Sequence, residues 1–162
     1  MKTVFITGTN KGLGLEFSKQ YLNEGHAVIA TCRNPDQAAE LNALHAMHPG
    51  KLTVLKMDLS DEASIQRIGH DIKDRPVDIF ISNAGTAKGY VSEAHLNNFG
   101  FVQSGPWIDV FRTNCVGPLL LAQVVHPNIL LGQDKKLVFI TSKPASITEN
   151  TGGAMYLSLI HI

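Results

Sequence analysis

The sequence predicts an α/β fold in which a doubly wound parallel sheet is covered by helices. The first observation is that short apolar runs alternate with segments of helical periodicity, which is typical of strands joined by crossover helices. The second is that the first apolar run passes directly into a glycine-rich segment, after which a helical pattern begins. No repeat, linker or low-complexity tract interrupts this alternation, so we expect one domain.

Five strands are predicted from the apolar runs: Lys2–Ile6, Ala27–Cys32, Leu52–Met57, Val77–Ser82 and Leu137–Thr141. The last run is almost wholly apolar, which favours a buried strand. The segment from Asn83 to Gly105 is rich in glycine and weakly periodic. We expect it to be a long loop at the carboxyl edge of the sheet, where ligands bind in such folds.

Four helices are predicted between the strands, from Leu13 to Gly25, from Pro35 to Pro49, from Ser60 to Ile72 and from about Pro106 to Leu131. Ser60 is the expected cap of the third helix, and Ile65, Ile68 and Ile72 should form its apolar face. Pro127 should either kink the fourth helix or mark its last turn.

Composition gives no sign of a broad electrostatic partner. Fourteen Lys and Arg balance fourteen Asp and Glu, and we therefore expect neither nucleic acid nor an anionic membrane as a partner. The sequence has no secretory pattern at its start, and no stretch is expected to span a bilayer. Cys32 and Cys115 lie far apart and form no metal or redox motif. A reduced, cytoplasmic protein without a metal site is the natural interpretation.

The glycine segment Thr7-Gly8-Thr9-Asn10-Lys11-Gly12-Leu13-Gly14 is suited to hold a phosphate. Its glycines let the backbone approach a ligand, and the following helix points free N–H groups and its positive dipole end at an anion. The spacing is neither that of a P-loop nor G-x-G-x-x-G. It reads TGxxxGxG and resembles the cofactor loop of the short-chain dehydrogenase/reductase family.

Four further segments resemble this family in the same order along the chain. They are Asp58-Leu59, Ser82-Asn83-Ala84-Gly85, Asn114 within Arg112–Pro118, and Ser142 at the end of the fifth strand. The resemblance implies that Asp58 binds the adenine, that Asn83 to Gly85 form the floor of the cofactor site, that Asn114 helps to hold a proton-relay water, and that Ser142 is the catalytic serine. Each match alone could instead be a cap or a turn.

The end of the second strand indicates which dinucleotide is bound. An NAD site usually places an acid there to accept hydrogen bonds from the ribose 2′-OH, whereas this chain has Cys32 followed by Arg33. Arg33 and Lys11 together suit a 2′-phosphate, because a guanidinium binds it bidentately and an ammonium adds a point charge. NADP(H) is therefore favoured over NAD(H), although both cations could simply be solvated.

The resemblance implies a Rossmann-like sheet of about seven strands, of which five are present, so the sheet is C-terminally incomplete. The implied cofactor-binding residues are Gly8, Asn10, Lys11, Gly12, Leu13, Gly14, Arg33, Asp58, Leu59, Asn83, Ala84 and Gly85, and the implied catalytic residues are Asn114, Ser142 and Tyr156. The family motif is Tyr-x-x-x-Lys, and here Ile160 occupies the lysine position after Tyr156. Either Tyr156 is catalytic and only the lysine is missing, or Ser158 stands at the catalytic tyrosine position and both are lost.

We expect residues 1–156 to form a truncated cofactor-binding domain and residues 157–162 to be a non-native tail. The tail matches the hexapeptide encoded by one frame of a sequencing-adapter end, and the alternative is a natural apolar C-terminus. The expected function is hydride transfer between NADP(H) and a small carbonyl or alcohol substrate, in a fragment that is inactive by itself. The alternative is a non-catalytic NADP(H)-binding or sensing module. The resemblance also implies that the full-length form pairs through the long helix as a homo-oligomer.

Overall fold

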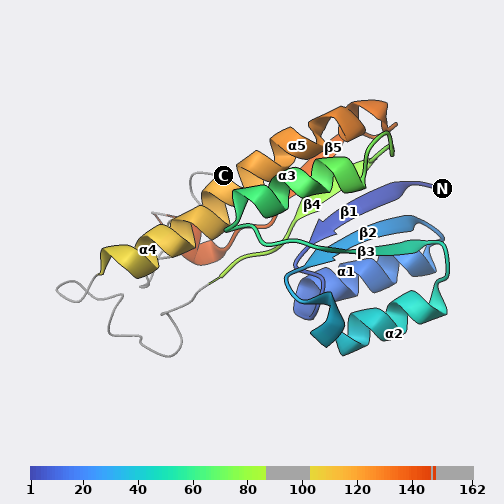
Figure 1. Ribbon diagram of the computed structural model, residues 1–162, viewed down its shortest axis with the longest axis horizontal. Helices are drawn as coiled ribbons and strands as arrows, with labels where there is room; N and C mark the ends of the chain where they lie inside the picture. Colours follow the sequence, from blue (N-terminus) through green and yellow to red (C-terminus); the bar gives the residue numbers. More distant parts are fainter. Residues whose placement is uncertain (87–102, 147, 149–162) are drawn as a thin grey trace.

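Five parallel strands form the centre of the molecule, which is a computed structural model that describes residues 1–86, 103–146 and 148 (Figure 1). The strands are β1 (Thr3–Thr7), β2 (Ala27–Cys32), β3 (Leu52–Lys56), β4 (Ile79–Ser82) and β5 (Lys136–Phe139). Their order in the sheet is β3-β2-β1-β4-β5, and all four neighbouring pairs are parallel. This is the order of a doubly wound nucleotide-binding sheet, with the reversal between β1 and β4.

The helices cover both faces of this sheet, so that each face has its own apolar core (Figure 1). They are α1 (Gly12–Asn23), the short 3-10 helix η1 (Pro35–Gln37), α2 (Ala39–Met47), α3 (Glu62–Asp71), α4 (Ser104–Phe111), the π-helical turn η3 (Arg112–Val116), α5 (Gly117–Leu131) and the 3-10 helix η4 (Lys143–Ala145). One core lies under α1 and α2, and the other lies under α3 and α5. The predicted doubly wound α/β fold is confirmed.

The starts of α3 and α2 differ from the predicted residues because of local hydrogen bonds and backbone conformation. Asp61, and not Ser60, caps α3, because the Asp61 carboxylate accepts a hydrogen bond from the Ala63 N–H at 3.0 Å. Ser60 instead donates its hydroxyl to Asp58 Oδ1 at 2.7 Å. The predicted second helix is divided into η1 and α2 at Ala38, whose backbone leaves the helical region.

The fifth strand differs most from its prediction. It is an edge strand with β4 as its partner, and Leu137 and Val138 are 47 % and 38 % exposed. The prediction of a buried strand is therefore wrong, because an apolar run is buried on both faces only where both are covered. Among the residues that the structure describes, no strand pairs with the outer edge of β5, and an edge strand of this kind offers backbone donors and acceptors for pairing.

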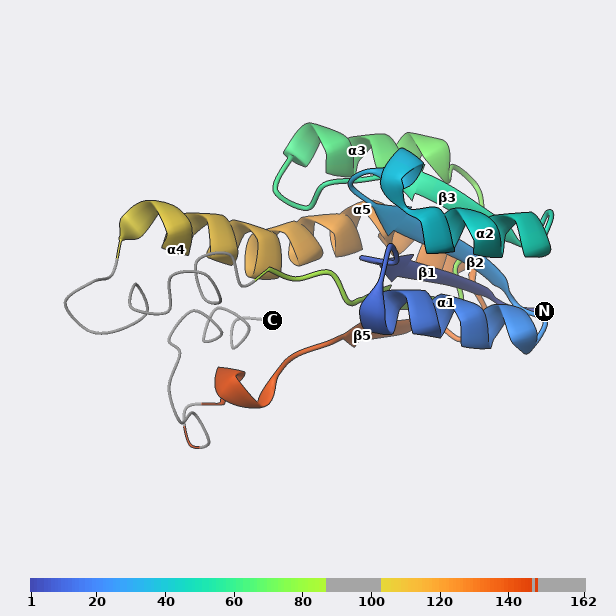
Figure 2. The ribbon, with the colours of Figure 1, turned by 90° about the horizontal axis from the view of Figure 1, so that it is seen from below.

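The fourth helical region begins at Ser104, two residues before the predicted start, and runs to Leu131 through α4, η3 and α5 (Figure 2). Pro127 lies inside α5 near its end, and the helix continues past it. One 18-residue window of this 28-residue helical region has a mean hydropathy of 1.3. By its length and composition the region could span a bilayer, so the expectation that no stretch is long and apolar enough to do so is wrong. Because 44 % of that window is buried in the fold, and a core helix passes the same test, this is weak support for a membrane span.

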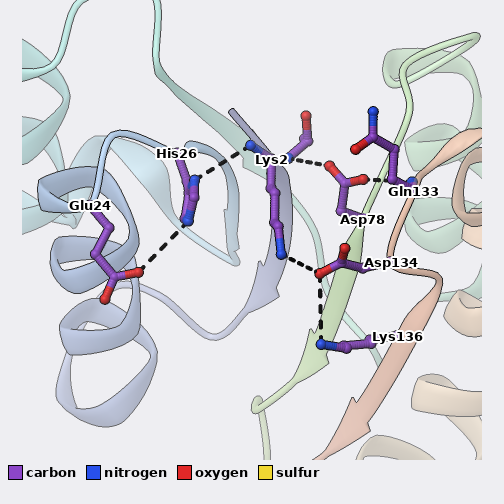
Figure 3. A network of polar contacts seen from close by, with 8 residues as sticks. Lys2, Glu24, His26, Asp78, Gln133, Asp134 and Lys136 are labelled. Atoms are coloured by element: carbon purple, nitrogen blue, oxygen red, sulfur yellow. Dashed lines mark hydrogen bonds and ion pairs between the residues drawn. The ribbon is translucent and has the colours of Figure 1, made fainter.

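A polar network holds the amino ends of β1, β4 and β5 together (Figure 3). Asp78 is almost fully buried, and its carboxylate accepts hydrogen bonds from the Thr3 and Gln133 N–H groups, each at 2.7 Å. The Lys2 ammonium pairs with Asp134 at 2.6 Å. This network lies at the edge of the sheet opposite to the glycine segment, so it stabilises the sheet without occupying the ligand side.

Candidate functional site

A cleft of about 590 Å³ lies at the carboxyl ends of the strands, beside the point where the strand order reverses. Its walls come from β2, from the segments that follow the first four strands, from the start of α1 and from the α4–η3 helix. The lining residues are Gly8, Asn10, Lys11, Gly12, Thr31, Arg33, Met57, Asp58, Leu59, Ser60, Asn83, Ala84, Gly85, Thr86, Asp109, Arg112 and Thr113. Ligands of open α/β sheets bind at this position. The cleft is therefore the candidate functional site.

Thr7 is the hydrogen-bonding centre that holds two walls of the cleft together. Its side chain is fully buried, and its hydroxyl oxygen accepts from the Asn83 N–H at 3.0 Å and the Ala84 N–H at 2.9 Å. The Asn83 side-chain amide donates back to the Thr7 carbonyl at 3.0 Å and to the Gly8 carbonyl at 3.3 Å. The ends of β1 and β4 are thereby fixed relative to each other.

Two glycines allow the backbone to pass closely in this region. Gly8 has φ +70°, and a Cβ there would lie 2.9 Å from the Ala84 Cα. A Cβ on Gly14 would lie 2.3 Å from the Gly8 carbonyl oxygen and 2.6 Å from the Asn83 Nδ2. A side chain at either position would push the glycine segment away from β4, so both glycines are required for the shape of the site.

The amino end of α1 faces this cleft with the features of an anion site. Lys11 is the N-cap residue, and its side chain makes no capping hydrogen bond, while the first turn has no acidic residue. The first-turn N–H groups thus point along the helix axis toward the Asn10–Gly12 wall. Within the described ranges, no ion pair is recorded for Lys11 or Arg33, and both side chains are exposed.

Asn114 lies in the π-helical turn η3 and is almost fully buried. Its side chain forms two reciprocal hydrogen bonds with the Thr86 backbone: Oδ1 accepts from the N–H at 2.8 Å, and Nδ2 donates to the carbonyl at 2.9 Å. This pairing fixes the segment after Gly85 against the long helix. π-helical turns are rare in proteins, but those that occur are often found at functional sites. Arg112 and Thr113, which belong to this turn, lie in the cleft wall.

Ser142 is the one further predicted catalytic residue that lies within the described ranges. It follows β5, is half-buried and does not line the cleft. The Ile140 N–H donates to the Ser82 carbonyl at 2.9 Å, so pairing with β4 continues for one residue beyond β5 toward Ser142. Tyr156, Ser158 and Ile160 lie outside the described residues.

Ten of the twelve predicted cofactor residues line one cleft, and Leu13 and Gly14 do not. Leu13 is exposed, and Gly14 acts behind the wall through its contact with Gly8. Sequence reasoning missed the lining residues Thr31, Met57, Ser60, Thr86, Asp109, Arg112 and Thr113. Sequence reasoning also missed the structural role of Thr7. The sequence did contain a signal for this role, since a hydroxyl residue stands at the end of the first strand, directly before the first glycine.

Other reactive groups in the described part of the chain give no further candidate centre. Cys32 and Cys115 are free and buried, and burial raises the pKa of each thiol above its ordinary value. They are therefore poor nucleophiles at neutral pH. Within the same residues, no three His, Cys, Asp or Glu side chains gather in a way that could hold a metal ion.

The geometry agrees with the result of comparison with known protein families. The family model described as short chain dehydrogenase matches residues 2–158. The chain belongs to the short-chain dehydrogenase family. The resemblance drawn from the glycine segment is thereby confirmed, and in this short-chain dehydrogenase Gly8, Asn10, Lys11 and Gly12 of that segment line the cleft.

Curated relatives are oxidoreductases by name. An uncharacterized oxidoreductase of Schizosaccharomyces pombe is 29 % identical over 152 residues, which cover 90 % of this chain and 56 % of the relative. An uncharacterized oxidoreductase of Bacillus subtilis is 30 % identical over 147 residues, which cover 87 % of this chain and 49 % of the relative. The chain thus spans about half the length of these curated relatives.

Solved structures show the same fold. A carbonyl reductase from Pseudomonas aeruginosa matches with a TM-score of 0.87 and 26 % identity, covering 99 % of this chain and 72 % of that one. An NADPH-bound carbonyl reductase from chicken fatty liver matches with a TM-score of 0.83 and 27 % identity, covering 99 % of this chain and 66 % of that one. The fold of this chain is therefore similar to that of these carbonyl reductases over about two thirds of their length.

Proposed function

We propose that this chain is the cofactor-binding part of an NADP(H)-dependent oxidoreductase that transfers a hydride between the nicotinamide and a small carbonyl or alcohol substrate. One observation carries the proposal: the uncapped amino end of α1 and the cations Lys11 and Arg33 line one cleft at the reversal of strand order. No acid stands at the end of β2, where an NAD site usually has one. Two solved structures of similar fold, from Pseudomonas aeruginosa and chicken, contain NADP or NADPH.

Different residues of the cleft suit different parts of the dinucleotide. The pyrophosphate lies against the Gly8–Gly12 wall, because helix N–H groups and the dipole stabilise an anion there. Arg33 and Lys11 bind the ribose 2′-phosphate through charge-assisted hydrogen bonds. Asp58 and Leu59 contact the adenine, and the Asn83–Gly85 segment, held by Thr7, forms the floor.

When bound, NADP(H) supplies the hydride, and the protein must orient the substrate and move a proton. Ser142 would hold the substrate oxygen with its hydroxyl. Asn114, whose side chain is held by the Thr86 backbone, would help to hold a proton-relay water. Tyr156 would exchange the proton with the substrate oxygen as general acid or base.

A non-catalytic NADP(H)-binding or sensing module is the second candidate, and one sequence observation favours it. Ile160 stands where the family motif has the lysine that lowers the pKa of the tyrosine. We therefore propose that the 162-residue chain binds NADPH but reduces no carbonyl compound by itself. Carbonyl-dependent consumption of NADPH by this chain would show that the alternative is wrong and that the motif is dispensable.

Titration of the chain with NADPH and with NADH, followed by nicotinamide fluorescence, tests the cofactor proposal. We expect tighter binding of NADPH, and we expect Arg33→Gln to weaken NADPH binding by about 10-fold while leaving NADH unchanged, because one charge-assisted contact is lost. Lys73→Gln is the matched control, since Lys73 is an exposed cation outside the cleft. Equal affinity for both cofactors in the wild type would refute the NADP preference.

Two further proposals concern the setting of the protein. The cytoplasm suits the free, buried thiols of Cys32 and Cys115. Pairing of the full-length form through the long helix agrees with the exposed apolar side chains along it, which are Ile108, Phe111, Val116, Leu119, Leu130 and Leu131. Sedimentation analysis of the full-length protein tests the second of these.

A further inference from the structure

The single tryptophan of the chain, Trp107, carries an unpaired hydrogen-bond donor. Within the part of the chain that the structure describes, its indole Nε1 is the one buried side-chain nitrogen or oxygen atom without a hydrogen-bond partner. An indole nitrogen donates a hydrogen bond and accepts none, and a buried donor without a partner costs free energy. Because buried polar groups of native proteins are nearly all paired, this N–H indicates an acceptor supplied by a ligand or by another chain.

Helical spacing places Trp107 on the buried face of the long helix. Trp107 and Val110 are three residues apart in α4, and Asn114 follows four residues later in η3. Residues at this spacing share one side of a helix, and both Val110 and Asn114 are almost fully buried. Trp107 thus lies on the same face as Asn114 and about 10 Å further along the helix axis, at a rise of about 1.5 Å per residue.

The amino end of this helical region, where Trp107 lies, extends past the carboxyl ends of the strands (Figure 2). Ligands of open α/β sheets bind on this side. Asp109 and Arg112 line the cofactor cleft, whereas Trp107 does not. Each residue of an α-helix turns by about 100°, so Trp107 and Asp109 point about 200° apart. The indole therefore lies outside the cofactor cleft, and the second reactant is the ligand that can supply its acceptor.

We propose that Trp107 is a specificity-determining residue for the substrate, and that its indole N–H donates a hydrogen bond to an oxygen atom remote from the reacting carbonyl or alcohol group. This inference rests on the proposed function, in which Asn114 stands at the proton side of the reaction. The indole ring packs against the apolar body of the substrate while its N–H binds the oxygen.

The separation of Trp107 from Asn114 limits the class of substrate. A compound that reacts near Asn114 and reaches the indole must be elongated, because the two residues are about 10 Å apart along the helix. Its body must be apolar to pack on the ring, and its far end must carry an acceptor, since the indole nitrogen can only donate. The substrate class is therefore an elongated aromatic or apolar carbonyl compound with a second oxygen, such as a keto ester.

The test measures by calorimetry the binding of two ketones to the 162-residue chain saturated with NADP⁺, which carries no hydride to reduce them. Methyl para-acetylbenzoate has an ester opposite its ketone, and para-isopropylacetophenone has a hydrocarbon group there. Wild type should bind the ester about 3- to 10-fold more tightly than the hydrocarbon probe, as expected for one hydrogen bond. Trp107→Phe keeps an aromatic ring and removes the N–H, so it should bring this ratio close to one and leave binding of the hydrocarbon probe nearly unchanged.

Tyr21→Phe is the matched control, because it also removes one donor from an aromatic side chain, on α1 and outside the cleft. This variant should keep the wild-type ratio. Trp107→Phe should unfold at nearly the wild-type temperature, since the N–H that it removes has no partner in the described residues. A large fall of its midpoint, with both probes weakened equally, would show a purely structural role and overturn the inference.

The remaining outcomes separate this inference from the proposal on which it rests. A chain that does not bind NADP⁺ overturns both. A chain that binds NADP⁺ but binds neither ketone, or binds both equally, overturns this inference alone, and so does an unchanged ratio in Trp107→Phe.

A second copy of the chain is the other candidate source of the acceptor. Because the chain has one tryptophan, its indole fluorescence reports on Trp107 alone. The emission maximum of the unliganded chain should stay constant on dilution. An emission maximum that shifts as a dimer dissociates would place a second copy at the indole and overturn the assignment to substrate.

Discussion

Replacing Thr7 by Val tests whether the hydroxyl of this residue holds the cofactor floor in place. Valine keeps the volume of the buried side chain but removes the acceptor of the Asn83 and Ala84 N–H groups. An unsatisfied buried donor costs about 1–3 kcal/mol, and both donors here belong to half-buried residues. We therefore use the lower part of this range for each donor and expect a total loss of about 2–3 kcal/mol.

Urea unfolding followed by far-UV circular dichroism measures this loss. With an m-value of about 2 kcal/mol/M, the midpoint should fall by about 1 M. Thr7→Ser is the matched control, because it keeps the hydroxyl and removes one buried methyl group, which costs about 1 kcal/mol. NADPH binding should be retained in Thr7→Ser and weakened in Thr7→Val. A Thr7→Val protein as stable as wild type, or more stable than Thr7→Ser, would refute the role assigned to the hydroxyl.

Two further predictions concern the glycine segment and the opposite edge of the sheet. Gly14→Ala should destabilise the fold by about 1–3 kcal/mol and weaken NADPH binding, because the new Cβ would lie 2.3 Å from the Gly8 carbonyl oxygen. Gly105→Ala is the control, since a Cβ there would meet no atom within 4 Å, and thermal unfolding should show it to be neutral or slightly stabilising. Equal midpoints for the two variants would contradict the close approach. The Lys2 ammonium lowers the pKa of Asp134 below its ordinary 3.8, and Asp134 in turn raises the pKa of Lys2 above 10.5. The ion pair therefore stabilises the fold at pH values between 3.8 and 10.5. This stabilisation is lost as the pH falls through the lowered pKa of Asp134 or rises through the raised pKa of Lys2. Unfolding midpoints of wild type and Asp134→Asn should accordingly differ at neutral pH and converge in acid, and a constant difference would refute this linkage.

Much of the fold was predictable because its signals are local. The bounds of β2 agree with the prediction at both ends, since an apolar run flanked by Gly25 and Arg33 leaves little choice. Ile65, Ile68 and Ile72 are all fully buried, as their helical spacing predicted. Ten of the twelve residues predicted to bind the cofactor line one cleft, because a parallel sheet gathers the carboxyl ends of its strands at one edge.

The features that were missed depend on contacts between distant parts of the chain. The burial of β5 could not be predicted from its composition, because burial depends on which elements cover it and the apolar run carries no such information. Asp109 and Arg112 line the cleft only because the helix carries them past the ends of the strands. Ser60 and Asp61 are both residue types that suit the N-cap of α3. Ser60 donates its hydroxyl to Asp58, and Asp61 accepts from the Ala63 N–H and caps the helix.

The π-helical turn at Arg112–Val116 adds a residue to one turn of an otherwise continuous helix. Each residue of an α-helix advances by about 100°, so the turn changes the angular phase between α4 and α5. Deleting one residue there would let the whole segment close as a regular α-helix. Since α5 packs on α3, where a Cβ on Gly69 would lie 3.1 Å from the Val124 side chain, the rotation would fall on α4. Asp109 would then turn away from the cleft while α5 and the core beneath it stayed in register.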